Sequence, residues 1–117
     1  MDRMVIKSLQ DIFEAIEEID SYFDRYPRRF DVYLSESILK SAIHMKLSII
    51  GEATNRILKV APEIRITNAR QIVNTRNYLI HGYDSLRPEM IWAIIINDLP
   101  LLRREVAALI ESSEGAD

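Results

Sequence analysis

The chain has 117 residues, a formal net charge of −3 and no cysteine. Its length fits a single domain, and the lack of cysteine excludes a disulfide framework and a thiolate metal site. A mildly acidic chain also lacks the broad basic face of a typical nucleic-acid coat protein, although it can still hold a local basic cleft.

The hydropathy pattern contains no membrane or export signal. No uncharged apolar stretch reaches the roughly 18 residues of a membrane span. No apolar run follows a basic start, as it would in a signal peptide. Together with the absence of cysteine, this pattern predicts a cytoplasmic protein.

Apolar residues repeat with helical spacing along the first half of the chain. In the first predicted helix they step by four and three residues, the a/d pattern of a helix in a bundle. These residues are Val5, Leu9, Ile12, Ile16, Ile19, Phe23 and Tyr26. Pro27 ends this helix. A second helix is predicted from about Asp31 or Ser35 to about Leu58. Its apolar residues occupy more than one stripe, so it is either central or faces a second subunit, and Gly51 within it indicates close approach of another helix.

A third helix is predicted after the break that follows the second. Thr67 or Asn68 is a suitable N-cap residue. The helix then runs to about His81, where Gly82 is a suitable C-terminal stop.

The fourth predicted helix begins at Pro88, which fits a first helical turn. Pro100 lies inside its apolar repeat and should kink or divide it near Asp98. The sequence therefore predicts an all-α, antiparallel bundle of four helices, or of five if Pro100 divides the last one. The bundle covers residues 1–110, and residues 111–117 form a flexible acidic tail.

Residues that could act in catalysis lie at the end of the third predicted helix, in the segment Arg76-Asn77-Tyr78-Leu79-Ile80-His81-Gly82-Tyr83. Histidine titrates near neutral pH and can move protons. Arginine stays charged and presents a planar fork of donors that suits phosphate. Arg76 and His81 are therefore a minimal set for phosphodiester chemistry without a metal.

On a regular helix these two side chains do not point the same way. At about 100° per residue, Arg76 falls on the apolar stripe of the third helix. Asn77 and His81 are neighbours on another face, with Asn74 beside them. Arg76 and His81 would converge only if the last turn unwinds at Gly82 or if a second copy of the chain completes the cleft.

Each of these residues also has a structural interpretation. An arginine on an apolar stripe is usually paired with a carboxylate, here Glu52 or Asp98, because burying a lone charge is costly. His81 can serve as a favourable charge at a helix C-terminus. Tyr83, after the helix stop, can be a packing residue.

Two further groups of residues, around His44 and around Pro27, can also be either functional or structural. His44 sits among apolar residues with no ligand-spaced partner, which indicates a core or interface histidine. Arg25, Arg28 and Arg29 flank Pro27 beside Tyr26; they form either a phosphate-binding patch with a stacking ring or a solvated interhelix loop.

The segment from Arg76 to Tyr83 resembles the R-x4-H-x-Y signature of the HEPN superfamily, and in particular the HepT-like toxins of bacteria and archaea. Three other segments fit the same group: Ile50-Gly51-Glu52-Ala53, Pro88-Glu89-x-x-Trp92 and Asn97-Asp98-Leu99-Pro100. The resemblance spans about residues 5–110.

The resemblance implies a helical bundle that forms a homodimer and brings two R-x4-H motifs to one cleft. Many such proteins are endoribonucleases that use neither a metal nor another cofactor, so Arg76 and His81 would be catalytic and Asn77 supporting. HepT-like proteins pair with a minimal nucleotidyltransferase antitoxin, which attaches AMP to the tyrosine matched here by Tyr83. Other HEPN proteins have lost cleavage, which leaves a non-catalytic module that binds RNA or protein as the alternative.

The residues themselves agree with RNA cleavage. RNA carries its own nucleophile, the 2′-hydroxyl group. A neutral His81 can deprotonate it, while a protonated His81 of the partner subunit donates a proton to the leaving oxygen. Arg76 can bind the nonbridging oxygens more tightly as their negative charge grows.

Overall fold

The computed structural model describes residues 1–82 and 87–115. Throughout these ranges the regular structure is helical, so the predicted all-α bundle is confirmed. The helices are α1 (Arg3–Tyr22), α2 (Phe30–Ser35), α3 (Ser37–Val60), α4 (Ala69–His81), α5 (Pro88–Ala93) and α6 (Leu99–Gly115), and a π-helical segment, η2 (Ile94–Asp98), joins the last two. None of the helices in these ranges is both long enough and apolar enough to cross a bilayer.

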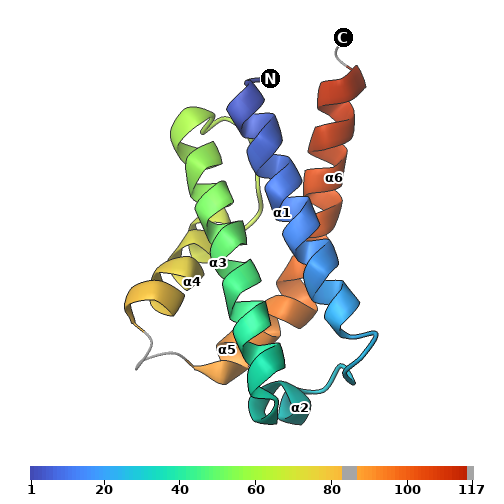
Figure 1. Ribbon diagram of the computed structural model, residues 1–117. Helices are drawn as coiled ribbons and strands as arrows, with labels where there is room; N and C mark the ends of the chain where they lie inside the picture. Colours follow the sequence, from blue (N-terminus) through green and yellow to red (C-terminus); the bar gives the residue numbers. More distant parts are fainter. Residues whose placement is uncertain (83–86, 116–117) are drawn as a thin grey trace.

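The long helices α1, α3 and α6 form the body of the bundle, in which α1 packs against both of the others (Figure 1). The shorter α4 packs on α3, on the side of the bundle away from α6. Helices α2 and α5 contact each other at the lower end, whereas α1 begins and α6 ends at the upper end. Helix α4 is therefore supported mainly by one neighbour and has a free outer face.

The a/d seam predicted for α1 forms the centre of the core. Its residues within the helix are almost completely buried: Val5, Leu9, Ile12, Ile16 and Ile19. The helix starts at an N-cap, where the Asp2 carboxylate accepts a hydrogen bond of 2.7 Å from the Met4 amide. It ends at Tyr22, ahead of Pro27, so Phe23 and Tyr26 pack on the core from the following turn.

Aromatic rings fill the lower end of the bundle. Trp92 of α5 packs against Phe23, Phe30 and Tyr33, with ring centroids 5.7–6.2 Å apart. The Tyr33 hydroxyl is hydrogen-bonded to Nε2 of His44 at 2.6 Å. Burial lowers the pKa of His44, helped by the nearby charge of Lys40. His44 is thus a packing residue, as its apolar surroundings in the sequence predict.

The second predicted helix is divided in two: α2 begins at Phe30, next to the expected start at Asp31, whereas α3 begins at Ser37, two residues after the other expected start at Ser35. Glu36 has an extended backbone (φ −94°, ψ 96°) and separates α2 from α3. On α3 a second apolar stripe stays open to solvent, because Ile38, Met45 and Ile49 are 75%, 65% and 37% exposed. Helix α3 is therefore not buried all round, and its second stripe has no partner within residues 1–82 and 87–115.

The entry to α4 is fixed by a carboxylate from α6. The Glu105 carboxylate accepts hydrogen bonds from the Thr67 amide at 3.0 Å and from the Thr67 hydroxyl at 2.6 Å. Asn68 takes the N-cap position, as predicted, but its side chain makes no capping bond. Its backbone is left-handed (φ 59°), a conformation that asparagine tolerates better than most residues.

Two prolines organise the last third of the chain. Pro88 occupies the first turn of α5, as predicted. Pro100 cannot donate a backbone hydrogen bond, and the helix is divided just before it by the π-helical segment Ile94–Asp98. Helix α6 then continues to Gly115, into the segment where the sequence predicts a flexible tail; the domain division at residue 110 stays a prediction.

Candidate active site

Gly51 sets the separation between α3 and α4. A Cβ atom added there would lie 2.2 Å from Cβ of Arg76, 3.0 Å from its Cγ and 3.2 Å from the carbonyl oxygen of Ile72. Any side chain at this position would overlap α4. The close helix approach predicted from Gly51 is confirmed, and the residue it meets is the arginine of the motif.

The polar end of Arg76 is held by oxygen atoms of the chain itself. Its Nη2 is 2.6 Å from Oε2 of Glu52, and its Nη1 donates a hydrogen bond of 2.8 Å to Oδ1 of Asn77. Its Nε is buried and has no hydrogen-bond partner among the described residues. The guanidinium is therefore oriented by α3 on one side and by its own helix on the other.

Glu52, one of the two carboxylates predicted to pair with Arg76, is the observed partner. The other, Asp98, lies half-buried in the π-helical segment, and this burial raises the pKa of its carboxyl group. Glu52 reaches Arg76 because it directly follows Gly51, at the point where α3 and α4 are closest.

His81 lies on a different face of α4 from Arg76. It lines a hollow of about 440 Å³ together with Asn74, Asn77, Tyr78 and Gly82. Its side chain is exposed in the last helical turn. The predicted divergence of Arg76 and His81 is thus confirmed.

The last turn of α4 does not unwind to bring these two side chains together. The Gly82 amide donates a helical hydrogen bond of 3.0 Å to the Tyr78 carbonyl. Gly82 ends the helix, as predicted, but with φ −122° rather than in the left-handed conformation. The sequence left two ways to bring Arg76 and His81 together: an unwound last turn or a second copy of the chain. Because the last turn is helical, the second copy is the one that remains.

Asn77 links the two parts of the site, since it accepts from Arg76 and also lines the hollow that contains His81. Tyr78, for which the sequence suggested no role, lines the same hollow and is 49% exposed. Its position three residues before His81 places both on one helix face, a spacing that could have revealed it. Tyr83 lies outside the described residues.

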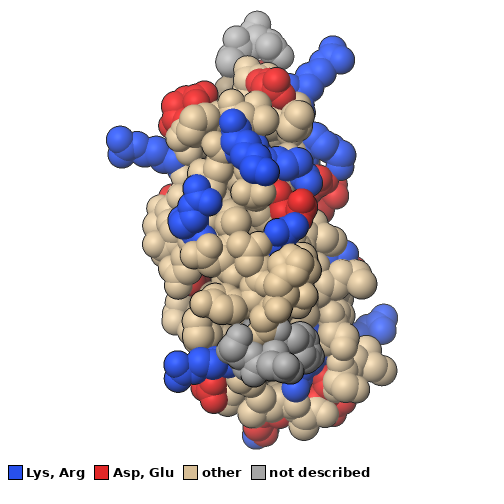
Figure 2. Space-filling view, turned by 90° about the vertical axis from the view of Figure 1, so that its left-hand side faces the viewer, with Lys and Arg blue, Asp and Glu red and all other residues tan. Residues whose placement is uncertain are grey.

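The surface around α4 is seen in Figure 2, which looks at the bundle from the left of Figure 1. In the upper half of this view lysine and arginine side chains lie among several aspartate and glutamate side chains, while the middle is mostly uncharged. This face therefore carries mixed charge next to an uncharged surface.

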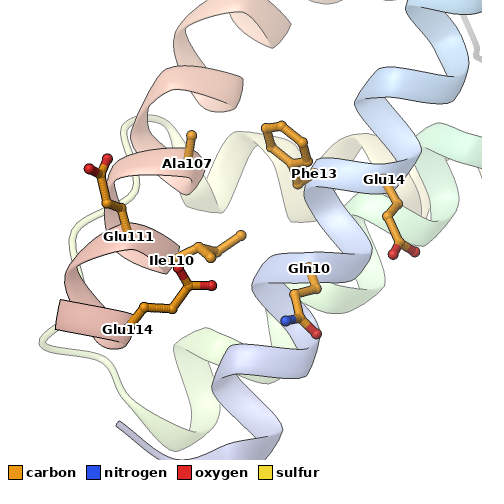
Figure 3. Close-up of a pocket in the computed structure, with 7 residues that line it drawn as sticks. All are labelled: Gln10, Phe13, Glu14, Ala107, Ile110, Glu111 and Glu114. Carbon is orange, nitrogen blue, oxygen red and sulfur yellow. The ribbon is translucent and has the colours of Figure 1, made fainter. Parts of the chain in front are cut away.

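Other hollows and charged groups of the described residues contain fewer side chains that could take part in a reaction. A hollow of about 500 Å³ between α1 and α6 is lined by Glu14, Glu111 and Glu114 over Phe13 and Ile110 (Figure 3). It lies on α6, away from α4. Within residues 1–82 and 87–115, no three His, Asp or Glu residues lie close enough together to bind a metal ion.

Two of the three arginines around Pro27 are engaged locally. Arg28 lies 3.5 Å from the carboxylate of Asp20 and over the ring of Phe23. Arg29 forms two hydrogen bonds, of 3.0 and 2.8 Å, with the Asp31 carboxylate. These pairs favour the interhelix-loop interpretation over a phosphate-binding patch.

Comparison with known proteins identifies the family of this helical chain. The profile of the family described as "Ribonuclease HepT-like" matches residues 12–109, which contain both Gly51 and the whole R-x4-H-x-Y segment. The chain belongs to the HepT-like ribonuclease family. The resemblance to HEPN proteins deduced from the motif is thereby confirmed.

Relatives similar in sequence to this chain come from archaea and bacteria. The chain is 31% identical to "Putative RNase MJ0127" of Methanocaldococcus jannaschii, over 93% of this chain and 89% of the relative. It is also 31% identical to "Probable ribonuclease HepT" of Thermococcus cleftensis, over 81% of this chain and 86% of the relative. No solved structure matches the chain significantly.

The Gly51→Ala variant tests whether the close approach of α3 and α4 depends on glycine. The added methyl group would overlap Arg76, and such overpacking typically costs about 1–3 kcal/mol. Better helix propensity of alanine recovers up to about 1 kcal/mol. We expect a net loss in the free energy of unfolding of roughly 1–2 kcal/mol, measured by urea denaturation. Ser41→Ala, at an exposed position on α3, is the control; unchanged stability of Gly51→Ala would contradict this account of the packing.

Proposed function

We propose that this protein is a metal-independent endoribonuclease whose catalytic residues are Arg76 and His81, with Asn77 in a supporting role. The observation that carries the proposal is the geometry at Asn77, which joins an oriented guanidinium to the hollow that contains the histidine. Membership of the HepT-like ribonuclease family supports the same reaction.

In this reaction the RNA supplies its own 2′-hydroxyl nucleophile. His81 in its neutral form removes the hydroxyl proton, and Arg76 stabilises the negative charge that grows on the nonbridging oxygens. A protonated His81 of the partner subunit gives a proton to the 5′-oxygen as the P–O bond breaks. The products are a 2′,3′-cyclic phosphate and a 5′-hydroxyl end.

A homodimer is part of the proposal because one chain offers one histidine near the site. The exposed stripe of α3 supports this assembly, since Ile38, Met45 and Ile49 form an apolar surface that no other described residue covers. Glu52 follows Ile49 by one turn and pairs with Arg76. An interface on this stripe would therefore extend to the motif and bring two copies of it close together.

The Met45→Asp variant tests the dimer. Met45 is 65% exposed in the single chain, so a charge there should leave the fold intact but be costly within an apolar interface. We expect sedimentation at micromolar concentration to give a dimer for the wild type and a dissociation constant raised at least about tenfold for the variant. Met4→Asp, in the first turn of α1 at the upper end of Figure 1, is the control. A monomeric wild type would count against the composite site.

Cleavage is tested with purified protein, tRNA and mRNA in the presence of EDTA. We expect wild-type protein to cut RNA and leave 2′,3′-cyclic phosphate ends. Arg76→Ala and His81→Ala should each slow cleavage by at least about 100-fold while the circular dichroism spectrum stays unchanged. Loss of all cleavage in EDTA, or full activity of His81→Ala, would disprove the mechanism.

We further propose that the protein is the toxin of a toxin–antitoxin pair and that a minimal nucleotidyltransferase silences it. The resemblance to HepT-like toxins points to Tyr83 as the modified residue, two positions after His81. AMP attached there would carry a phosphate close to where RNA should bind. A covalently held group competes at high effective concentration, so a weak contact would suffice. The cytoplasmic location expected from the sequence fits such a pair and stays a prediction.

Coexpression with a nucleotidyltransferase encoded beside this protein tests the regulation. Mass spectrometry should find an AMP group on Tyr83, and the modified protein should no longer cleave RNA. Tyr83→Phe, which lacks the hydroxyl acceptor, should remain active after the same coexpression. An unmodified Tyr83 in a fully inhibited complex would rule out the covalent route and leave masking by the partner.

The second candidate is a non-catalytic module that binds RNA or protein. It is favoured by the pairing of Arg76 with Glu52, which on its own would be a structural contact between helices. Binding of RNA by the dimer without any cleavage in the EDTA assay would identify this function.

A further inference from the structure

Both terminal nitrogens of the Arg76 guanidinium have a partner in this structure. Nη2 lies 2.6 Å from Oε2 of Glu52, and Nη1 donates a hydrogen bond of 2.8 Å to Oδ1 of Asn77. The third nitrogen, Nε, is buried. A ligand that approaches from solvent therefore meets an arginine already paired with a carboxylate. Its positive charge is therefore partly offset before RNA arrives.

A carboxylate and a phosphate bind arginine in the same manner. Both present two oxygen atoms to the planar fork, and both form charge-assisted hydrogen bonds of similar length. The Glu52 oxygen thus occupies a position that a phosphate oxygen would need if Arg76 acts on RNA.

The two partners differ in how firmly they are held. Cβ of Arg76 packs directly on the backbone of Gly51, and its side chain is 23% exposed. The Glu52 side chain is 46% exposed, and within the described part of the chain its carboxylate is paired with Arg76 alone. Ion pairs with this degree of exposure are weak. When an anion competes, Glu52 can move into solvent while Arg76 stays.

We infer that Glu52 is an internal competitor of the RNA phosphate at Arg76. It satisfies the arginine in the free protein and must be displaced when a phosphate group binds. The inference rests on the proposed function only for the identity of the anion, since the competition itself is a property of the Arg76–Glu52 pair. In consequence, the Glu52 carboxylate weakens phosphate binding at Arg76. It also makes this binding less dependent on salt than phosphate binding at an unpaired arginine.

The test removes the charge of Glu52 but keeps its shape, in the Glu52→Gln variant. The probe is a fluorescein-labelled, uncleavable 2′-O-methyl RNA oligonucleotide, and its binding is followed by anisotropy over a series of KCl concentrations. We expect binding at low salt to be about three- to fivefold tighter than that of the wild type. The plot of log affinity against log salt concentration should become steeper by about 0.7, the value for one added phosphate contact on a single strand.

Glu111→Gln is the matched control, because it removes one negative charge from the α1–α6 hollow of Figure 3, on α6 and away from α4. It should leave the affinity unchanged. In an Arg76→Ala background, Glu52→Gln should no longer tighten binding. Weaker or unchanged binding by Glu52→Gln would overturn the inference, as would equal tightening by Glu111→Gln, which would reveal a net-charge effect.

A second probe separates this inference from the proposed function. Inorganic phosphate is titrated into isotope-labelled protein while the guanidinium resonances of Arg76 are followed by NMR. If Glu52→Gln raises the phosphate affinity at Arg76 in a protein that cleaves no RNA, the competition stands and the ribonuclease proposal fails. If the wild type cleaves RNA but the variant binds both probes no better, the ribonuclease proposal stands and the competition fails.

Discussion

The contact between Gly51 and Arg76 is the constraint on which the rest of the site depends. Helix α4 rests mainly on α3, so its depth is set where the two backbones come closest. A glycine there lets the base of the Arg76 side chain pack against the α3 backbone. The guanidinium then emerges beside the next residue of α3, Glu52, which binds it.

This arrangement explains how α4 can carry a charged side chain, Arg76, on its apolar side. An arginine near the apolar side of a helix must find a partner or carry a large desolvation cost. Here the carboxylate of Glu52 and the amide of Asn77 neutralise and orient it at the edge of the core. The Asn77 contact and the packing of the Arg76 side chain on Gly51 do not involve Glu52, so they would keep the guanidinium oriented if an anion displaced that carboxylate.

Much of the fold follows from local patterns in the sequence. The a/d spacing of α1 predicts its buried face, and Pro88, Gly82 and Pro100 each mark a helix boundary where the structure has one. The close helix approach follows from Gly51 alone, because glycine inside a helix is costly without a reason.

The features that the sequence does not reveal depend on tertiary contacts. The break between α2 and α3 at Glu36 coincides with ring packing around Trp92, which brings together residues far apart in the chain. Asn68 uses its backbone rather than its side chain at the start of α4, because Glu105 already binds the preceding Thr67. For Arg76 the sequence left two carboxylates open, and the choice between them follows from where α3 and α4 are closest.

The geometry of α4 also explains why the motif would need a second copy. An intact helix up to His81 keeps the histidine on the outer face and Arg76 on the side of α3. Bending the last turn to join them would break the Gly82–Tyr78 hydrogen bond and expose apolar groups that now pack on the core. A second chain leaves the hydrogen bond and the core packing intact, because it can bring another histidine and another arginine to the same surface. The separation of Arg76 from His81 within one chain is therefore the arrangement expected if the cleft is shared between two.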